Sequence, residues 1–257
     1  MARKLPGAPC SSLERDSGVS VCEFGVPADA ATRTIALVGD SHAGHWRGAV
    51  NAVARAKGWH GLSVTHTSCP LQKALRDLPE PRRSQCIRWK RETFRWFQRH
   101  PEVSTVFVAG LTGGSGVVPR GGLGPFGTAV DSYIDAWAEL PATVEQIVVI
   151  RDTPKVRADI QDCVQRAIEQ GMRADLACAE PRHAALDPDP ATAAAARMRS
   201  PRVRTVDLTR FFCDARHCYP VIGGALVCRD QNHLTAVFST TLGPFLLRAV
   251  DRLGVGD

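Results

Sequence analysis

The segment Ile35-Ala36-Leu37-Val38-Gly39-Asp40-Ser41-His42 decides the fold. Its four uninterrupted apolar residues are typical of a strand buried on both faces of a parallel sheet. Gly39 and Asp40 then favour a sharp turn, and the residues from Trp46 onward have helical spacing. The segment therefore predicts a strand, a turn and a helix. Ser41 stands at the carboxyl end of that strand, where open α/β sheets build their sites.

Ser41 has two interpretations at this position. A helix N-terminus favours negative charge nearby, so the exposed hydroxyl could serve as a nucleophile. Asp and Ser are also good helix caps, so the same residues could simply start the helix. The segment alone leaves both interpretations open.

A second polar segment near the other end of the chain favours the nucleophile. Asp230-Gln231-Asn232-His233-Leu234-Thr235 precedes the apolar run of the last expected helix. An Asp and a His three positions apart can lie on one side of a turn. The carboxylate can then fix the imidazole tautomer while the other ring nitrogen faces a serine hydroxyl. We therefore predict Ser41, His233 and Asp230 as a catalytic group.

Together these segments resemble the end motifs of the SGNH (GDSL-like) hydrolase superfamily. More narrowly, the chain resembles the SGNH domain of acyltransferase-3 family proteins, which O-acylate cell-surface glycans. The likeness runs from about Thr34 to the C-terminus and is carried by the segments 39–46, 68–70, 86–89, 206–209 and 229–235, with Cys213 and Cys218. It implies a flavodoxin-like α/β three-layer sandwich, with a parallel five-stranded sheet, helices on both faces and a small hairpin before the last helix.

The resemblance fails at one motif in the middle of the chain. The superfamily has Gly-x-Asn-Asp after the third strand, whereas this chain has Ala109-Gly110-Leu111-Thr112-Gly113-Gly114. The asparagine that would bind an oxyanion is missing. The resemblance then implies an oxyanion hole of Ser41 and Ser68, with Gly110 and Thr112 as substitutes. We also expect three residues beside the motifs to contact substrate, namely Asp40, His42 and Asn232.

The length of 257 residues fits one α/β domain of generous size. No apolar run approaches the roughly 20 residues that span a bilayer, and the basic N-terminus lacks the apolar core of a signal peptide. We expect residues 1–33 to form an irregular arm, the remnant of a linker, that packs on an SGNH domain at 34–257. The chain is then a domain excised from behind a membrane portion on which its export depended.

Nine cysteines without Cys-x-x-Cys spacing predict disulfides and an oxidising compartment, and no metal site. A cytosolic protein with reduced cysteines is the alternative. Four bridges and one leftover thiol, Cys228, are expected: Cys10–Cys22, Cys69–Cys86, Cys163–Cys178 and Cys213–Cys218. The resemblance favours the second and fourth pairs, and the sequence leaves the connectivity open.

The net charge of +6 and the pI near 9.0 indicate tolerance of anionic surroundings, such as wall polymers or lipid head groups. No nucleic-acid fingerprint accompanies this charge, so DNA and RNA are set aside as partners. The glycine-rich stretch 110–116 lacks the Gly-Lys of a P-loop, which excludes that phosphate-binding motif.

Strands and helices alternate along the chain, which indicates a parallel sheet covered on both faces. The expected strands are 34–38, 60–66, 103–109, 146–150 and 203–208. The first expected helix begins near Trp46. Further helices are expected at 84–99, 127–140, 160–169, 191–198 and 237–253. A hairpin around Gly223-Gly224, within 219–227, is expected to deliver Asp230 and His233 to the site.

The expected function is serine-based acyl transfer on the extracytoplasmic side of a membrane. Ser41 takes an acyl group, by resemblance acetyl or another short one, and passes it to a glycan hydroxyl, or to water when the enzyme acts as an esterase. The resemblance implies that acyl-CoA is the ultimate donor, delivered through an acyltransferase-3 transmembrane domain that tethers the parent protein. We expect no bound cofactor and a monomeric domain. The alternatives are a carbohydrate esterase (deacetylase) and a non-catalytic glycan-binding domain.

Overall fold

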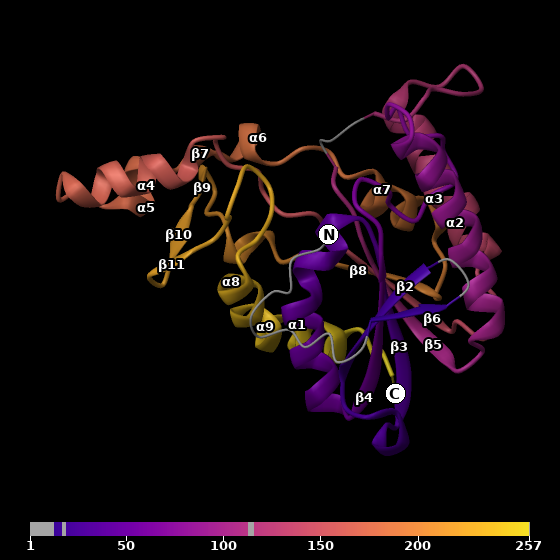
Figure 1. Cartoon of the computed structure of the whole chain (residues 1–257). Coiled ribbons are helices and arrows are strands. Elements are labelled where there is room, and N and C mark those ends of the chain that lie inside the picture. The colour runs from indigo at the N-terminus through magenta and orange to yellow at the C-terminus, as the bar shows by residue number, and fades with distance from the viewer. Residues whose placement is uncertain (1–12, 17–18, 113–115, 257) are drawn as a thin grey trace.

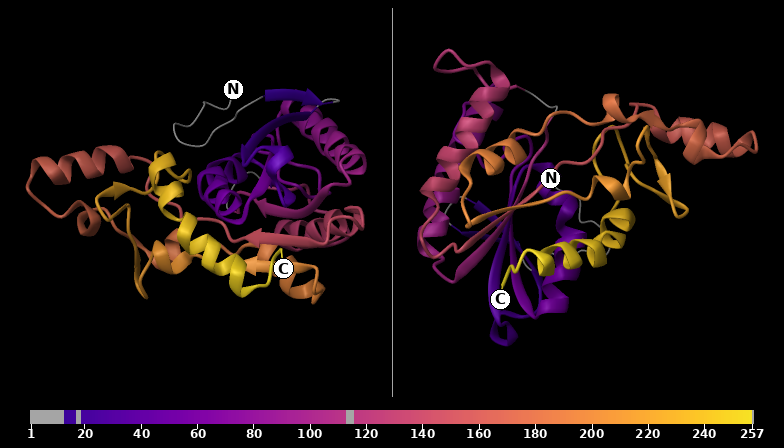
Figure 2. Two further views of the ribbon diagram at one scale, coloured as in Figure 1. Left: turned by 90° about the horizontal axis from the view of Figure 1, so that it is seen from below. Right: turned by 180° about the vertical axis from the view of Figure 1, so that it is seen from behind.

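A computed structural model describes residues 13–16, 19–112 and 116–256 of the chain. They form an α/β sandwich around a seven-stranded sheet with the strand order β1-β2-β4-β3-β5-β6-β8. Helices cover both faces of this sheet (Figures 1 and 2). Neighbouring strands from β4 to β8 are parallel, so the predicted five-stranded parallel sheet is confirmed at the centre of the larger one.

The elements match the predicted alternation closely. The strands of the main sheet are β1 (Leu13–Asp16), β2 (Val19–Gly25), β3 (Arg33–Gly39), β4 (Trp59–Thr65), β5 (Val103–Ala109), β6 (Gln146–Ile150) and β8 (Val203–Val206). The helices packed on the sheet are α1 (Ser41–Lys57), α2 (Arg82–Arg99), α3 (Pro125–Glu139), α7 (Pro190–Met198) and α9 (Gly243–Arg252). Within the described part of the chain, no helix is long and apolar enough to cross a bilayer.

The apolar run of β3 is buried on both faces, as its sequence predicts. Ile35 and Leu37 belong to a core that includes side chains of α1 and α9. Ala36 and Val38 point the other way and belong to a second core with side chains of α2, α3 and α7. Successive residues of a strand face opposite sides of the sheet, so one four-residue run serves both cores.

The N-terminal stretch departs from the expectation of an irregular arm. Its described residues include β1 and β2, and β2 pairs antiparallel with β4, with Val21 opposite Val64. The reason is that apolar residues of β2 serve both faces of the sheet: Val19 and Val21 belong to one core, and Phe24, which points the other way, belongs to the second. Composition rich in turn-forming residues concealed this pattern. Cys10, of the predicted Cys10–Cys22 pair, lies outside the described residues.

A lobe of short elements stands beside the sheet. It contains α4 (Ile160–Glu169), α5 (Ala174–Ala177), β7 (Glu180–Pro181), α6 (Arg182–Ala185), η2 (Thr209–Phe211) and β9 (His217–Cys218). Helices α4 and α5 project from the main body in every view (Figures 1 and 2). The predicted disulfides Cys69–Cys86, Cys163–Cys178 and Cys213–Cys218 are confirmed, and the last two brace this lobe.

The predicted hairpin is also present. β10 (Val221–Ile222) and β11 (Ala225–Leu226) pair around Gly223 and Gly224, both of which have positive φ. The single closing helix predicted at 237–253 is instead two helices, α8 (Ala236–Thr241) and α9. The break comes at Leu242 because Pro244, which has no N–H to continue a helix, occupies the first turn of α9.

Candidate active site

Ser41 is the first residue of α1 and follows β3 after one intervening residue, Asp40. The Asp40 carboxylate caps the helix by accepting from the His42 N–H (2.8 Å), and it also accepts from the Leu111 N–H (3.0 Å). Gly39 has φ +150°, and a side chain there would collide with the Ala109 carbonyl of β5. This close approach of two strands fixes the turn that presents Ser41 at the sheet edge.

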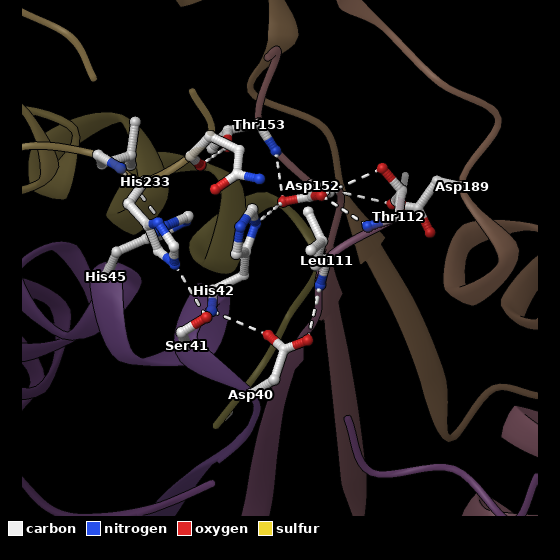
Figure 3. Close-up of polar contacts among 12 residues, drawn as sticks. Asp40, Ser41, His42, His45, Leu111, Thr112, Asp152, Thr153, Asp189 and His233 are labelled. Atoms are coloured by element: carbon white, nitrogen blue, oxygen red, sulfur yellow. Dashed lines mark hydrogen bonds and ion pairs between the residues drawn. The ribbon is translucent and has the colours of Figure 1, made fainter. Parts of the chain in front are cut away.

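His233 reaches Ser41 from a loop between β11 and α8 (Figure 3), and Asp230 belongs to the same loop. His233 Nε2 lies 2.9 Å from Ser41 Oγ, and His233 Nδ1 lies 2.9 Å from both carboxylate oxygens of Asp230. When Nδ1–H donates to the carboxylate, Nε2 is left as the acceptor for the serine hydroxyl. The predicted contact between segments from opposite ends of the chain is therefore present in the structure.

The backbone of the loop holds the Asp230 carboxylate. The N–H groups of Asn232 (3.1 Å) and His233 (2.9 Å) donate to its Oδ1. Burial works to raise the pKa of Asp230, but these N–H donors and the His233 ring outweigh burial and lower it. Asp230 is therefore an anion at neutral pH, as the orientation of His233 requires.

A second histidine–carboxylate pair, His42 and Asp152, lies beside His233 (Figure 3). His42 Nδ1 is 2.5 Å from Asp152 Oδ1, and both side chains are almost completely buried. The other oxygen, Oδ2, accepts from the backbone N–H (2.8 Å) and the hydroxyl (3.1 Å) of Thr112. Asp152 N–H in turn donates to the buried Asp189 (2.9 Å). This network joins α1 to the segments that follow β5 and β6.

Burial and charge act in opposite directions on the two histidines of α1. Burial disfavours a charged His42, but the Asp152 carboxylate outweighs this effect and raises the pKa of His42 to about 9. For His45, burial and the neighbouring charge of His42 both lower the pKa well below its usual value. The rings of His42 and His233 are 5.0 Å apart between centroids, so a buried cation adjoins the Ser41 site at neutral pH.

Exposure distinguishes the two pairs. The side chain of His233 is 21% exposed and that of Asp230 is 48% exposed, whereas His42 is 0% exposed. Only the exposed pair of His233 and Asp230, the outer pair, can contact a substrate without rearrangement. Asp40 and His42 are both enclosed and hold the start of α1, and the expectation that they contact substrate stays a prediction.

Asn232 has a different position from those two. It is half-buried, its carbonyl accepts from the Thr153 hydroxyl (3.4 Å), and its side-chain amide favours protonated His42 through hydrogen bonding. Asn232 therefore links the loop that carries His233 to the inner histidine pair, and its contact with substrate stays a prediction.

The expected oxyanion-hole residues are not equally available. Both donors of Thr112 are used by Asp152, so this residue supports the network and is not a free donor. Gly110 lies against the Tyr133 hydroxyl and Pro70, and the Ser68 hydroxyl accepts from Arg82 (2.8 Å). The backbone N–H of Ser41, in the first turn of α1, needs no partner within the helix. An oxyanion role for Ser41, Ser68 and Gly110 stays a prediction.

The cysteine outside the predicted pairs has no nucleophilic character. Cys228 is buried, and burial raises the pKa of its thiol to about 12. A thiolate there is negligible at neutral pH.

His42, His45 and Asp152 form the one group of candidate metal ligands among the described residues, with ligand atoms within 4.8 Å of one another. The oxygens of Asp152 already accept from His42, Thr112 and Thr153, and Leu234 N–H donates to His45 Nδ1. Because protein donors already use these atoms, we assign no metal to the group.

Sequence reasoning missed Asp152 and Asp189. Asp152 follows the buried strand β6 after one residue, and Asp40 follows β3 directly. The carboxyl ends of all strands in a parallel sheet lie at the same edge, so the position of Asp152 just after a buried strand indicated a place near Asp40. Asp189 caps α7 by accepting hydrogen bonds from the N–H groups of Ala191 and Thr192. In the sequence this residue is recognisable only as an acidic residue before a proline.

The fold and the Ser-His-Asp geometry define an SGNH-type α/β domain. The chain belongs to the family described as the SGNH domain fused to AT3 domains, whose sequence model matches residues 9–248. Acyl transfer or ester hydrolysis is the class of activity that this family supports. The three disulfides agree with an extracytoplasmic location.

Two solved structures are similar to the chain. The periplasmic domain of a lipopolysaccharide acetyltransferase from Salmonella ser. Paratyphi A has a TM-score of 0.63 at 14% identity, covering 89% of each chain. The carboxylesterase CesB of Bacillus subtilis has a TM-score of 0.35 at 13% identity, covering 93% of this chain and 88% of its own. No curated protein sequence matches the chain. At such identities the first similarity shows the fold alone.

Proposed function

We propose that this domain transfers a short acyl group, most simply acetyl, through an acyl-serine intermediate on Ser41. The observation that carries the proposal is the 2.9 Å contact between Ser41 Oγ and His233 Nε2 in a half-exposed site. His233 takes the hydroxyl proton as Oγ attacks the acyl carbonyl, and the Asp230 carboxylate stabilises the resulting imidazolium. His233 then returns the proton to the leaving group.

The second half-reaction decides between transfer and hydrolysis. A sugar hydroxyl, or water, loses its proton to His233 and attacks the acyl-serine, which releases Ser41. The oxyanion of each step is stabilised by the N–H of Ser41 at the positive end of α1, together with an N–H donor from the loop after β4 or β5. We propose a cell-surface or cell-wall glycan as the acceptor, with water as the competing acceptor.

The acyl group would reach this domain through the membrane portion of the parent protein. Membership of a family fused to AT3 domains supports a donor pathway in which acyl-CoA is consumed on the other side of the membrane. The domain described here would then receive the acyl group on the extracytoplasmic side while tethered to that portion.

Mass spectrometry after incubation with p-nitrophenyl acetate tests the acyl-serine intermediate. We expect one acetyl group on the peptide that contains Ser41, and none in the Ser41→Ala variant, which should fold normally. Candidate glycans added to the acetylated enzyme then separate acetyl transfer from hydrolysis. An unlabelled Ser41, together with no reaction towards a serine-directed phosphonate, would instead support a non-catalytic glycan-binding domain.

A further inference from the structure

Helices α2 and α3 lie on the side of the molecule away from the projecting lobe (Figure 1). Residues of these two helices and of the segment after β4 line a pocket of about 460 Å³. Its walls are α2, the segment 73–76 after β4, and the end of α3. Five of the residues that line it are basic: Lys73, Arg76, Lys90, Arg91 and Arg95. Ser41, His233 and Asp230 are not among its lining residues, so the pocket is separate from the site described above.

Lys90 is one of the two buried basic residues of this pocket, with Arg76. It is 8% exposed, and its ammonium group donates to the Ala74 carbonyl (2.7 Å). Among the described residues, no carboxylate forms an ion pair with it. An ammonium group has three donors and loses hydration when it is buried, so one carbonyl satisfies it only in part.

The acidic residues near the pocket are already paired. Glu139 on α3 pairs with Lys73, and Glu92 on α2 pairs with Arg91 and Arg95. Among the described residues that line the pocket, basic side chains therefore outnumber acidic ones. Low-dielectric walls around charges of one sign concentrate the potential and attract an anion.

We propose that this pocket binds the anionic group of an acidic sugar, a carboxylate, phosphate or sulfate carried on a sugar ring, with Lys90 at the centre of the contact. The volume is that of a small-ligand pocket, and Ile87 and Phe94 give it an apolar wall on which a ring can rest. The anion follows from the charges of the pocket alone. The choice of a sugar rests on the proposed function, in which a glycan is the acceptor.

The pH dependence of anion binding gives a further test, because it depends on the protonation of Lys90. Burial, with added repulsion from Arg76 and Lys73, lowers the pKa of Lys90 to about 7. The charged groups that face it are Lys73 and Arg76 from the segment after β4, Arg91 and Arg95 from α2, and Glu139 from α3. A bound anion favours the charged form and raises that pKa. Affinity is therefore greatest below pH 7 and falls as the pH rises above that value.

Isothermal titration calorimetry with glucuronic acid, glucose 1-phosphate, sulfate and glucose tests the proposal. The wild-type domain should bind both acidic sugars, bind sulfate more weakly, and not bind glucose. Lys90→Met should weaken binding at least tenfold. Arg88→Met is the matched control, because it removes one exposed charge from the same helix outside the pocket and should bind like the wild type.

Glucuronic acid has no titrating group between pH 6 and 9, so it reports on the protein alone. Its affinity for the wild type should fall over that range, whereas its affinity for Lys90→Met should stay constant. Thermal unfolding checks that Lys90→Met is folded. If that variant does not fold, Arg95→Met at the pocket rim supplies the comparison, with about threefold weaker binding expected.

Equal binding by wild type and Lys90→Met, or no binding of any acidic sugar, overturns the proposal. Binding to phosphatidylglycerol vesicles but to no free acidic sugar also overturns it, in favour of a lipid surface. The Ser41→Ala variant separates this proposal from the proposed function. It should lose acetyl labelling and still bind glucuronic acid as the wild type does.

Discussion

At the scale of single residues, the site is two histidine–carboxylate pairs that share one turn of α1. Ser41 faces the exposed pair of His233 and Asp230, and the next residue, His42, belongs to the buried pair. Consecutive residues of a helix point about 100° apart, so one turn can supply both a nucleophile to the surface and a cation to the interior.

Asp230→Asn tests the role of the outer carboxylate. The amide cannot stabilise the imidazolium and can hold the wrong tautomer of His233, so we expect kcat for p-nitrophenyl acetate to fall about 10³- to 10⁴-fold. The free energy of unfolding should change little, since Asp230 is 48% exposed on its side chain. A variant that keeps more than a tenth of wild-type turnover would remove Asp230 from the mechanism.

His42 and Asp152 make a prediction about stability and pH. The pKa of His42 is raised to about 9 in the folded protein, so its contribution is fully present below the ordinary value of 6.5 and is lost as the pH rises through about 9. That difference corresponds to about 3 kcal/mol. His42→Gln should therefore be less stable than the wild type by about this amount at pH 6, and the gap should narrow towards pH 10.

Urea unfolding of both proteins at pH 6, 8 and 10 measures this gap. Lys90, whose pKa is lowered, titrates in the opposite sense over the same range, but it is present in both proteins and cancels in the difference. A gap that does not depend on pH would show that the pair contributes by packing alone.

At the scale of elements, the turn between β3 and α1 depends on Gly39. A methyl group there would meet the Ala109 carbonyl, and φ of +150° is unfavourable for any other residue. Gly39→Ala should therefore destabilise the domain by about 1–3 kcal/mol or more, and should displace Ser41. Thermal unfolding and acetyl labelling of Ser41 measure the two effects, and Gly44→Ala, at an open position in the same helix, is the control.

The projecting helices α4 and α5 depend on their disulfide. Cys163 and Cys178 are 15 positions apart in the sequence, and for a loop of this length the entropy model gives about 3 kcal/mol of stabilisation. Replacing both cysteines by alanine should speed amide hydrogen exchange in α4 and α5 and leave exchange in β3 and β5 unchanged. Uniformly faster exchange would mean that the lobe and the sheet unfold together.

At the scale of the whole molecule, the parallel sheet and the outer pair could be predicted because each rests on a local pattern. The run 35–38 shows burial on both faces, and Asp230 and His233 stand three positions apart. The inner network could not be predicted, because Thr112, Asp152 and Asp189 become neighbours only through the strand order. The role of Thr112 differs from the predicted one for the same reason. Its glycine-rich loop suggested donors free to bind an oxyanion, but its N–H and its hydroxyl both donate to Asp152.

The strands near the N-terminus extend the domain beyond the boundary expected at residue 34. Phe24 on β2 is 4% exposed and its ring packs over Gly61 of β4. Phe24→Ala should cost about 3–5 kcal/mol in the free energy of unfolding, measured with denaturant. A cost below 1 kcal/mol would mean that β2 is an appendage and that the fold is complete without it.

Ser41 and His233 are 192 positions apart in the chain, and their contact needs the final hairpin and α8 in place. A refolding domain therefore acquires a reactive hydroxyl only in its last stages of assembly. A serine-directed phosphonate added at successive times after dilution from denaturant would label Ser41 only once His233 has reached it. It would time the joining of the two chain ends separately from the earlier formation of the sheet.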